Sequence, residues 1–272
     1  MGYFRIVCAV AIASFLSGAP AAFAANSPGQ IFDTEIENTI RLYATPVLSA
    51  DGLDPESEAI HIVNTPALNA FVSRGQRLFV TTGLLMGTEN AGQLIGVMAH
   101  ETGHIAGGHL ARLDTLMRDS SGPAVLSNIV GLAIAVLSKN PGAAAAVAGG
   151  TQHALRRNIL SFARTHERSA DRAALSYLDA TRQSSRGLLE FLEILEAEHA
   201  QVISRSRQQE LSYDVTHPLT RDRIEFIRAH VAKSPYSDNK PPPAITTAHA
   251  RMRAKLKGYI NHPGRTLRDY PP

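Results

Sequence analysis

The sequence predicts an α+β fold that is mainly α-helical. Apolar residues recur at helical spacing in several long segments, whereas β-branched and aromatic residues gather in one region, residues 59–85. The chain has 272 residues, of which 44% are hydrophobic, and this suffices for one globular domain with a sizeable core. Its 27 basic and 24 acidic residues are scattered along the chain, which argues against a nucleic-acid-binding protein.

Residues 1–24 predict a signal peptide. Arg5 supplies a positive charge, an apolar stretch of about ten residues follows, and the run Ala22–Ala24 offers the small residues that a signal peptidase recognises. The apolar stretch is shorter than the ~20 residues that a spanning helix needs, so cleavage after Ala24 is favoured over an uncleaved membrane anchor. The only cysteine, Cys8, lies in this segment, and a mature chain without cysteine suits the bacterial periplasm.

The first part of the mature chain is expected to contain a helix, a hairpin and a second helix. Residues 32–50 have the apolar spacing of an amphipathic helix. Two β-rich runs on either side of residues 73–76 predict a β-hairpin. A helix is then expected over about residues 90–113, with Thr88 or Asn90 as its N-terminal cap.

The second part of the chain is expected to be helical. Residues 121–150 are strongly apolar, and a Lys-Asn-Pro-Gly break divides them into two segments that are too short to span a membrane. They predict either a pair of buried helices or a lid that faces a membrane or a substrate. Long helices are expected over residues 152–180 and 186–203. Residues 236–272 predict a Pro-rich linker and a short basic tail, helical near residues 245–260.

The stretch VMAHETGHIAGGHL, within the predicted helix 90–113, carries two histidines four residues apart, His100 and His104. Residues at this spacing share one face of a helix, so both imidazoles can bind one ion. Glu101 is turned by about 100° from His100, so it can flank the metal and take a proton from the attacking water. Iron or cobalt would also suit such a site, but a helical site with a glutamate base favours one Zn²⁺ ion per chain.

A catalytic zinc usually has three protein ligands and one open position, so a third donor is expected downstream. Glu167 is the best candidate, and Asp171 lies on the same face of the predicted helix 152–180. One carboxylate could bind the metal while the other orients a ligand histidine. Taken alone, the pair would indicate a solvated helix face beside Arg168 and Arg172, but the histidine pair favours the metal site.

HETGH, followed by ERSAD 63 residues after its second histidine, resembles the HtpX and CAAX-prenyl-protease-like family of zinc metallopeptidases, or gluzincins. The similarity is greatest to the soluble periplasmic, BepA- and LoiP-like branch. It covers roughly residues 30–232 and includes GGHL after the motif and THPLTRDR near the end. The resemblance implies a zincin-like metallopeptidase domain over residues 25–235, with a small β-sheet edge beside the active-site helix.

The resemblance also implies a role for each residue of the site. His100, His104 and Glu167 would be the zinc ligands, and Glu101 would be the general base. Asp171 would orient one of the ligand histidines.

Two further histidines match family positions. His217, in THPLTRDR, is interpreted as a fourth, inhibitory zinc ligand, as a transition-state donor, or as a plain helix-entry residue before Pro218. His109 is interpreted as structural, because five residues beyond His104 on a continuous helix it would face away from the metal.

The substrate is expected to lie as an extended strand beside the hairpin, in contact with Asn69, Ala70 and Phe71. A plain structural sheet edge is the alternative of equal weight.

The sequence thus predicts a periplasmic zinc-dependent endopeptidase. Its expected substrates are unfolded or misassembled envelope proteins, a quality-control role that comes from the resemblance only. The alternative is a chaperone-like client-binding protein with a His-gated, mostly closed zinc site. A third possibility is a structural zinc domain, but such a domain would have no use for Glu101 as a base. After residue 240 the sequence predicts a short basic tail, whereas many periplasmic relatives continue into tetratricopeptide repeats. This difference argues against recruitment to outer-membrane assembly machinery. Peripheral association with the outer membrane stays open.

Overall fold

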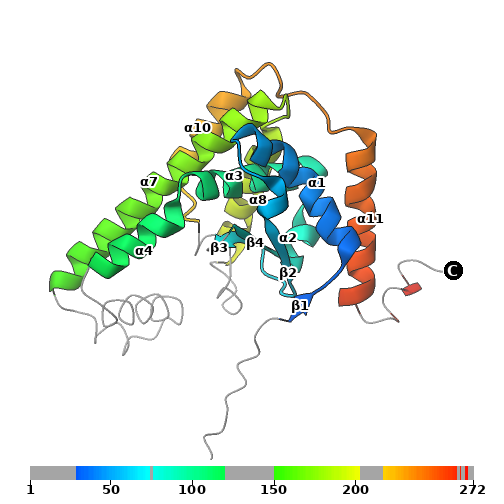
Figure 1. Ribbon diagram of the computed structural model, residues 1–272, viewed down its shortest axis with the longest axis horizontal. Coiled ribbons are helices and arrows are strands. Elements are labelled where there is room, and N and C mark those ends of the chain that lie inside the picture. Colours follow the sequence, from blue (N-terminus) through cyan, green and yellow to red (C-terminus); the bar gives the residue numbers. More distant parts are fainter. Residues whose placement is uncertain are drawn as a thin grey trace, which may run out of the picture.

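The computed structural model describes residues 29–73, 76–119, 150–202 and 217–261, together with 264, 267 and 268 (Figure 1). The predicted signal peptide and all but the last residue of the apolar region 121–150 lie outside these ranges. The described residues form mostly helices and one small sheet, so the prediction of a mainly helical α+β fold is confirmed. Within the described ranges, no helix is long and apolar enough to cross a membrane.

The sheet has four strands among the described residues, in the order β1-β2-β4-β3. They are β1 (Gln30–Ile31), β2 (Ala59–Val63), β3 (Ala70–Ser73) and β4 (Arg77–Thr81). Strands β3 and β4 pair antiparallel, which confirms the predicted hairpin, whereas β2 and β4 pair parallel. Strand β3 therefore forms one edge of the sheet, and it lies against the helix that carries the HETGH motif.

Helix α1 (Thr34–Ala50) begins where Asp33 accepts a hydrogen bond from the backbone N–H of Ile36, at 3.1 Å. One face of α1 is buried against the sheet and the motif helix. A short 3₁₀ turn, η1 (Pro55–Ser57), leads into β2, and helix α2 (Thr82–Gly87) follows β4 directly. These elements place the sheet and the motif helix in one hydrophobic core.

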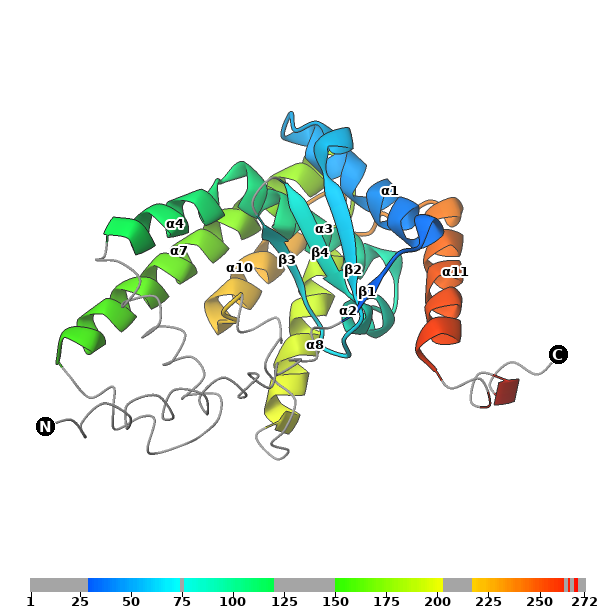
Figure 2. The same ribbon diagram turned by 60° about the horizontal axis from the view of Figure 1, so that its bottom comes forward.

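The motif helix, α3 (Ala91–Ala106), lies at the centre of the molecule (Figure 2). Asn90 caps it by accepting from the N–H of Gln93, as predicted. Two long helices pack on it, α7 (Gly150–Ala180) and α8 (Arg186–Val202). A Cβ at Gly103 would lie only 2.7 Å from the carbonyl oxygen of Ala170, so this glycine lets α7 approach the motif closely.

The prediction of one helix over residues 90–113 is wrong at its C-terminal end. Helix α3 ends at Ala106, and a separate helix, α4 (His109–Asp119), begins after two glycines. Gly108 has a φ of 58°, in the left-handed region that glycine adopts without strain, so the chain turns there. Helix α4 then runs beside α7, and the two extend from the core as an arm (Figures 1 and 2).

The chain closes with α10 (Arg221–Val231) and α11 (Pro243–Ile260). The domain boundary at residue 235 stays a prediction, but α11 contributes Met252 and Leu256 to the same core as α1 and α3. Helix α11 lies along α1, on the side of the molecule opposite the α4–α7 arm (Figure 1).

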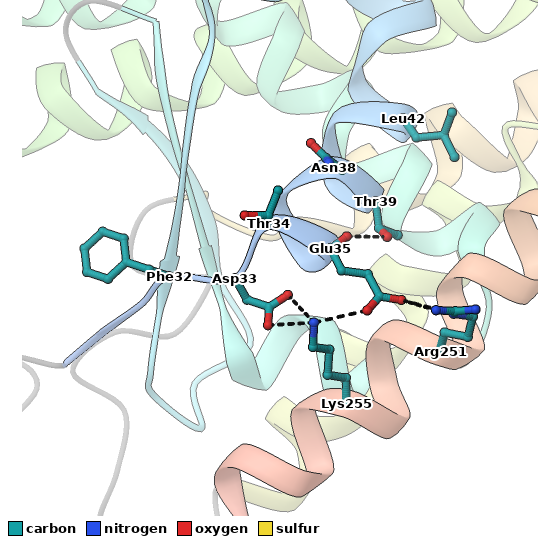
Figure 3. Close-up of a pocket in the computed structure, with 9 residues that line it drawn as sticks. All are labelled: Phe32, Asp33, Thr34, Glu35, Asn38, Thr39, Leu42, Arg251 and Lys255. Carbon is teal, nitrogen blue, oxygen red and sulfur yellow. Dashed lines mark hydrogen bonds and ion pairs between the residues drawn. The ribbon is translucent and has the colours of Figure 1, made fainter.

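A shallow surface pocket of about 790 Å³ lies where α11 meets the start of α1 (Figure 3). Lys255 Nζ donates to Asp33 and Glu35, at 2.8 and 3.1 Å, and Arg251 donates to Glu35 at 2.8 Å. These ion pairs between the charged side chains of the pocket hold α11 against α1. The pocket is completed by Phe32, Thr34, Asn38, Thr39 and Leu42.

Candidate metal centre

Four buried side chains from three parts of the chain converge beside the sheet edge. His100 and His104 come from α3, Glu167 comes from α7, and His217 comes from the segment before α10. One donor atom of each lies within 4.8 Å of the others. The structure therefore brings together the three predicted ligands and His217, which the sequence left open as a fourth ligand, a transition-state donor or a helix-entry residue.

Four separations between donor atoms of the group are close to those around a tetrahedral ion, with both oxygens of Glu167 taking part. Nε2 of His100 lies 3.0 Å from Nε2 of His104 and 3.3 Å from Oε2 of Glu167. Oε1 of Glu167 lies 3.2 Å from both His104 Nε2 and His217 Nδ1. Tetrahedral zinc with bonds of about 2.0–2.1 Å keeps its ligand atoms roughly 3.3–3.4 Å apart. Imidazole nitrogens and a carboxylate are donors that zinc accepts, so the donor set of the group fits a zinc ion.

A buried carboxylate and a buried arginine hold the ligand groups from outside. Asp171 Oδ1 lies 2.9 Å from Nδ1 of His100, so the other ring nitrogen faces the centre. Arg223 donates twice to Asp171, at 2.7 and 2.8 Å, and its Nη1 lies 2.8 Å from Oε2 of Glu167. Arg223 was not among the predicted site residues, and its only signal in the sequence is its place in THPLTRDR.

His109 starts a new helix instead of continuing α3. Because α3 ends at Ala106, the ring of His109 folds back and its Nδ1 lies 3.0 Å from Nδ1 of His104. His109 does not join the four donor atoms. It contacts the side of the His104 ring that faces away from Glu167.

His217 lies between the donor atoms and the edge strand. Its Nε2 is 3.3 Å from Oε1 of Glu101 and 3.2 Å from the carbonyl oxygen of Ala70. Glu101 is itself buried. In this arrangement His217 contacts Glu167 through Nδ1 and the predicted base, Glu101, through Nε2.

The three residues predicted to bind substrate differ in what they present at the edge. The carbonyl of Asn69 accepts from the N–H of Thr81, at 3.0 Å, so its main chain faces β4. Backbone groups alternate in direction along an antiparallel strand, so Phe71 also faces β4, whereas Ala70 faces outward. Of the three, Ala70 can bond an extended peptide through its main chain, and the role of all three stays a prediction.

Burial and neighbouring charges shift the pKa values of the site. Burial opposes the charged form of His100, but hydrogen bonds to Asp171 and Glu167 raise its pKa to about 9. Burial lowers the pKa of His104 to about 3 and raises the pKa of Glu101 above its usual range. A metal that binds His100 must therefore displace a proton.

A further buried carboxylate, Glu58, lies next to the start of β2. Burial raises its pKa to about 7 from an ordinary 4.5, with Arg41 opposing and Glu101 adding to the shift. Because the pKa of Glu58 is raised in the folded state, the stability that its protonated side chain contributes is complete below about pH 4.5. That contribution is lost as the pH rises through 7. We therefore expect Glu58→Gln to stabilise the fold at pH 8 by up to about 3 kcal/mol and to have little effect at pH 5.

Urea denaturation at both pH values measures this difference, and Glu56→Gln, at an exposed position two residues away, is the control. An equal effect of Glu58→Gln at pH 5 and pH 8 would contradict the prediction.

Comparison with known proteins places this site in a family. Residues 34–231 match peptidase family M48. The chain is 31% identical over 168 residues to the beta-barrel assembly-enhancing protease of Escherichia coli K12. The aligned region covers 61% of this chain and 33% of the relative. It is 27% identical over 183 residues to the mitochondrial metalloendopeptidase OMA1 of Schizosaccharomyces pombe, covering 66% of this chain and 49% of that protein.

A putative beta-barrel assembly-enhancing protease of Vibrio cholerae is 28% identical over 196 residues, 70% of this chain and 38% of the relative. The chain thus spans less than half the length of these relatives. The family match begins with α1, includes the HETGH helix, Glu167 and His217, and ends with α10. The resemblance seen in the sequence is confirmed, and the chain belongs to peptidase family M48.

Proposed function

We propose that the chain is a zinc-dependent endopeptidase. The observation that carries this proposal is the set of four buried side chains whose donor atoms lie within 4.8 Å of one another, with a buried glutamate next to the first of them in the sequence. We assign His100, His104 and Glu167 as the zinc ligands and Glu101 as the general base. A purely structural site would not need Glu101.

His100, His104 and Glu167 would hold the zinc ion, which would supply Lewis acidity to activate water and polarise the scissile carbonyl. Glu101 accepts the proton of the attacking water as the new C–O bond forms. It then gives that proton to the amine as the C–N bond breaks, so one water is consumed for each peptide bond.

We further propose that His217 closes the site. As a fourth ligand through Nδ1 it would fill the position that a catalytic zinc leaves open. Its Nε2 also engages Glu101 and the outward carbonyl of Ala70. Substrate and water therefore need His217 to move. The same closed arrangement favours the alternative, a client-binding protein with little turnover.

The substrate class follows from the edge strand and the relatives. An extended peptide that pairs with the outward main chain of Ala70 would be bound with little sequence preference, which suits unfolded chains. Together with the predicted signal peptide and the relatives named beta-barrel assembly-enhancing protease, this supports unfolded or misassembled envelope proteins as substrates. We place the protein in the periplasm, with peripheral association at the outer membrane compatible with this role.

The test is cleavage of a permanently unfolded, fluorescently labelled protein by the chain from Ala25 onward, with zinc present. We expect Glu101→Gln to lose at least about a hundredfold in rate while its zinc content, measured by mass spectrometry, stays the same. We expect His217→Ala to cleave faster than wild type.

Cleavage that survives Glu101→Gln would contradict the assignment of the base. If neither wild type nor His217→Ala cleaves despite bound zinc, the client-binding alternative is supported instead.

A further inference from the structure

His109 begins α4 and folds back onto the second histidine of the motif. Its Nδ1 lies 3.0 Å from Nδ1 of His104, and both side chains are buried. Nε2, the other ring nitrogen of His104, faces Glu167 and His100. His109 therefore occupies, for His104, the outer position that Asp171 occupies for His100.

The separation of these two nitrogens restricts where the protons can be. Two imidazole nitrogens form a hydrogen bond only when one carries the proton and the other offers its lone pair. A histidine that binds metal through Nε2 carries its proton on Nδ1. His104 Nδ1 is then the donor and His109 Nδ1 is the acceptor, so His109 is neutral with its own proton on Nε2.

The local sequence creates the space for this ring. A Cβ at Gly107 would lie 2.3 Å from Nε2 of His109, so the ring occupies the volume that a side chain at position 107 would need. The ring also meets His166 of α7, with the ring centroids 4.2 Å apart. Contacts with Gly107, His104 and His166 thus hold the His109 ring in place.

We propose that His109 is a positioning residue of the metal centre: its Nδ1 accepts the Nδ1–H of His104 and fixes the tautomer and ring orientation in which His104 Nε2 faces the metal. The inference rests on the proposed zinc site. It gives a role to a residue whose position in the sequence predicted only a structural one. Mutation of the outer hydrogen-bond partner of a metal-ligating histidine typically weakens metal binding by about 10- to 100-fold.

The test is the zinc dissociation constant, measured by competition with a chromophoric chelator. His109→Leu removes the acceptor and is expected to weaken zinc binding by about 10- to 100-fold. His109→Asn places Oδ1 at the same point of the side chain as Nδ1 and should bind within about threefold of wild type. The signal of the His104 Nδ1–H in ¹⁵N-edited NMR of the zinc-loaded protein should persist in His109→Asn and be lost in His109→Leu.

Gly107→Ala tests the same contact without changing His109. The φ of −67° at position 107 suits alanine, so the added Cβ acts on the His109 ring and should also weaken zinc binding. Gly258→Ala on α11 is the matched control, since a Cβ there meets nothing within 4 Å.

Wild-type zinc affinity in His109→Leu would overturn the inference. Zinc affinity in His109→Asn as weak as in His109→Leu would also overturn it, because the volume of the His109 ring, and not its hydrogen bond, would then support zinc binding. If circular dichroism shows that His109→Leu does not fold, His109→Phe takes its place, since it keeps a ring and removes the acceptor. A wild-type chain that binds no zinc would contradict the proposed function instead, so the two failures are distinguishable.

Discussion

Replacing Arg223 with methionine is expected to destabilise the fold by about 3–5 kcal/mol, because it leaves two buried carboxylates without their shared partner. Arg223 is 2% exposed and pairs with both Asp171 and Glu167. Methionine keeps much of the volume of arginine but supplies no hydrogen-bond donor. Urea denaturation of the zinc-free protein measures the loss directly, without a contribution from metal binding.

The control for this variant is Arg221→Met, at an exposed position of the same helix, which should change the stability by less than about 0.5 kcal/mol. Arg223→Lys keeps the charge but cannot form the two-pronged contact with Asp171, so an intermediate loss is expected. A loss below about 1 kcal/mol in Arg223→Met would show that other groups compensate the two carboxylates.

Zinc is expected to stabilise the wild-type chain and to leave Glu167→Gln unchanged. A ligand present at about a thousand times its dissociation constant adds about 4 kcal/mol to the stability of the folded state. For a domain of this size that is a rise in Tm of about 10 °C. Glutamine keeps the shape of the side chain but loses the anionic donor that contacts the three histidines of the centre.

The quantity to compare is the shift in Tm on adding zinc, because the substitution also changes the zinc-free protein. Glu196→Gln, at an exposed position of α8, should retain the full shift, and a chelator should reverse the shift in wild type. A shift in Glu167→Gln as large as in wild type would exclude Glu167 as a ligand.

Local features of the chain were predictable from the sequence. The period of the helix puts His100 and His104 on one face, and the cap at Asn90 depends on a neighbour three residues away. The β3–β4 hairpin likewise forms between adjacent strands. The interactions that decide these features lie within a few residues, so the sequence displays them.

Other parts of the site depend on contacts between distant segments. Arg223 meets Asp171 across 52 positions, and His217 meets Ala70 across 147. Apolar periodicity alone extended the motif helix to residue 113, but two glycines end it at Ala106. Because His109 was placed on that continuous helix, its contact with His104 was missed.

The wide spacing of the donors along the chain determines when in folding the metal can bind. His100 and His217 are 117 positions apart, and the donor set is complete only after α7 and the segment before α10 have both reached α3. We therefore expect zinc to bind after the folding transition state and to slow unfolding more than it speeds folding. The proposed zinc site would then become hydrolytic only once the chain's own folding is complete.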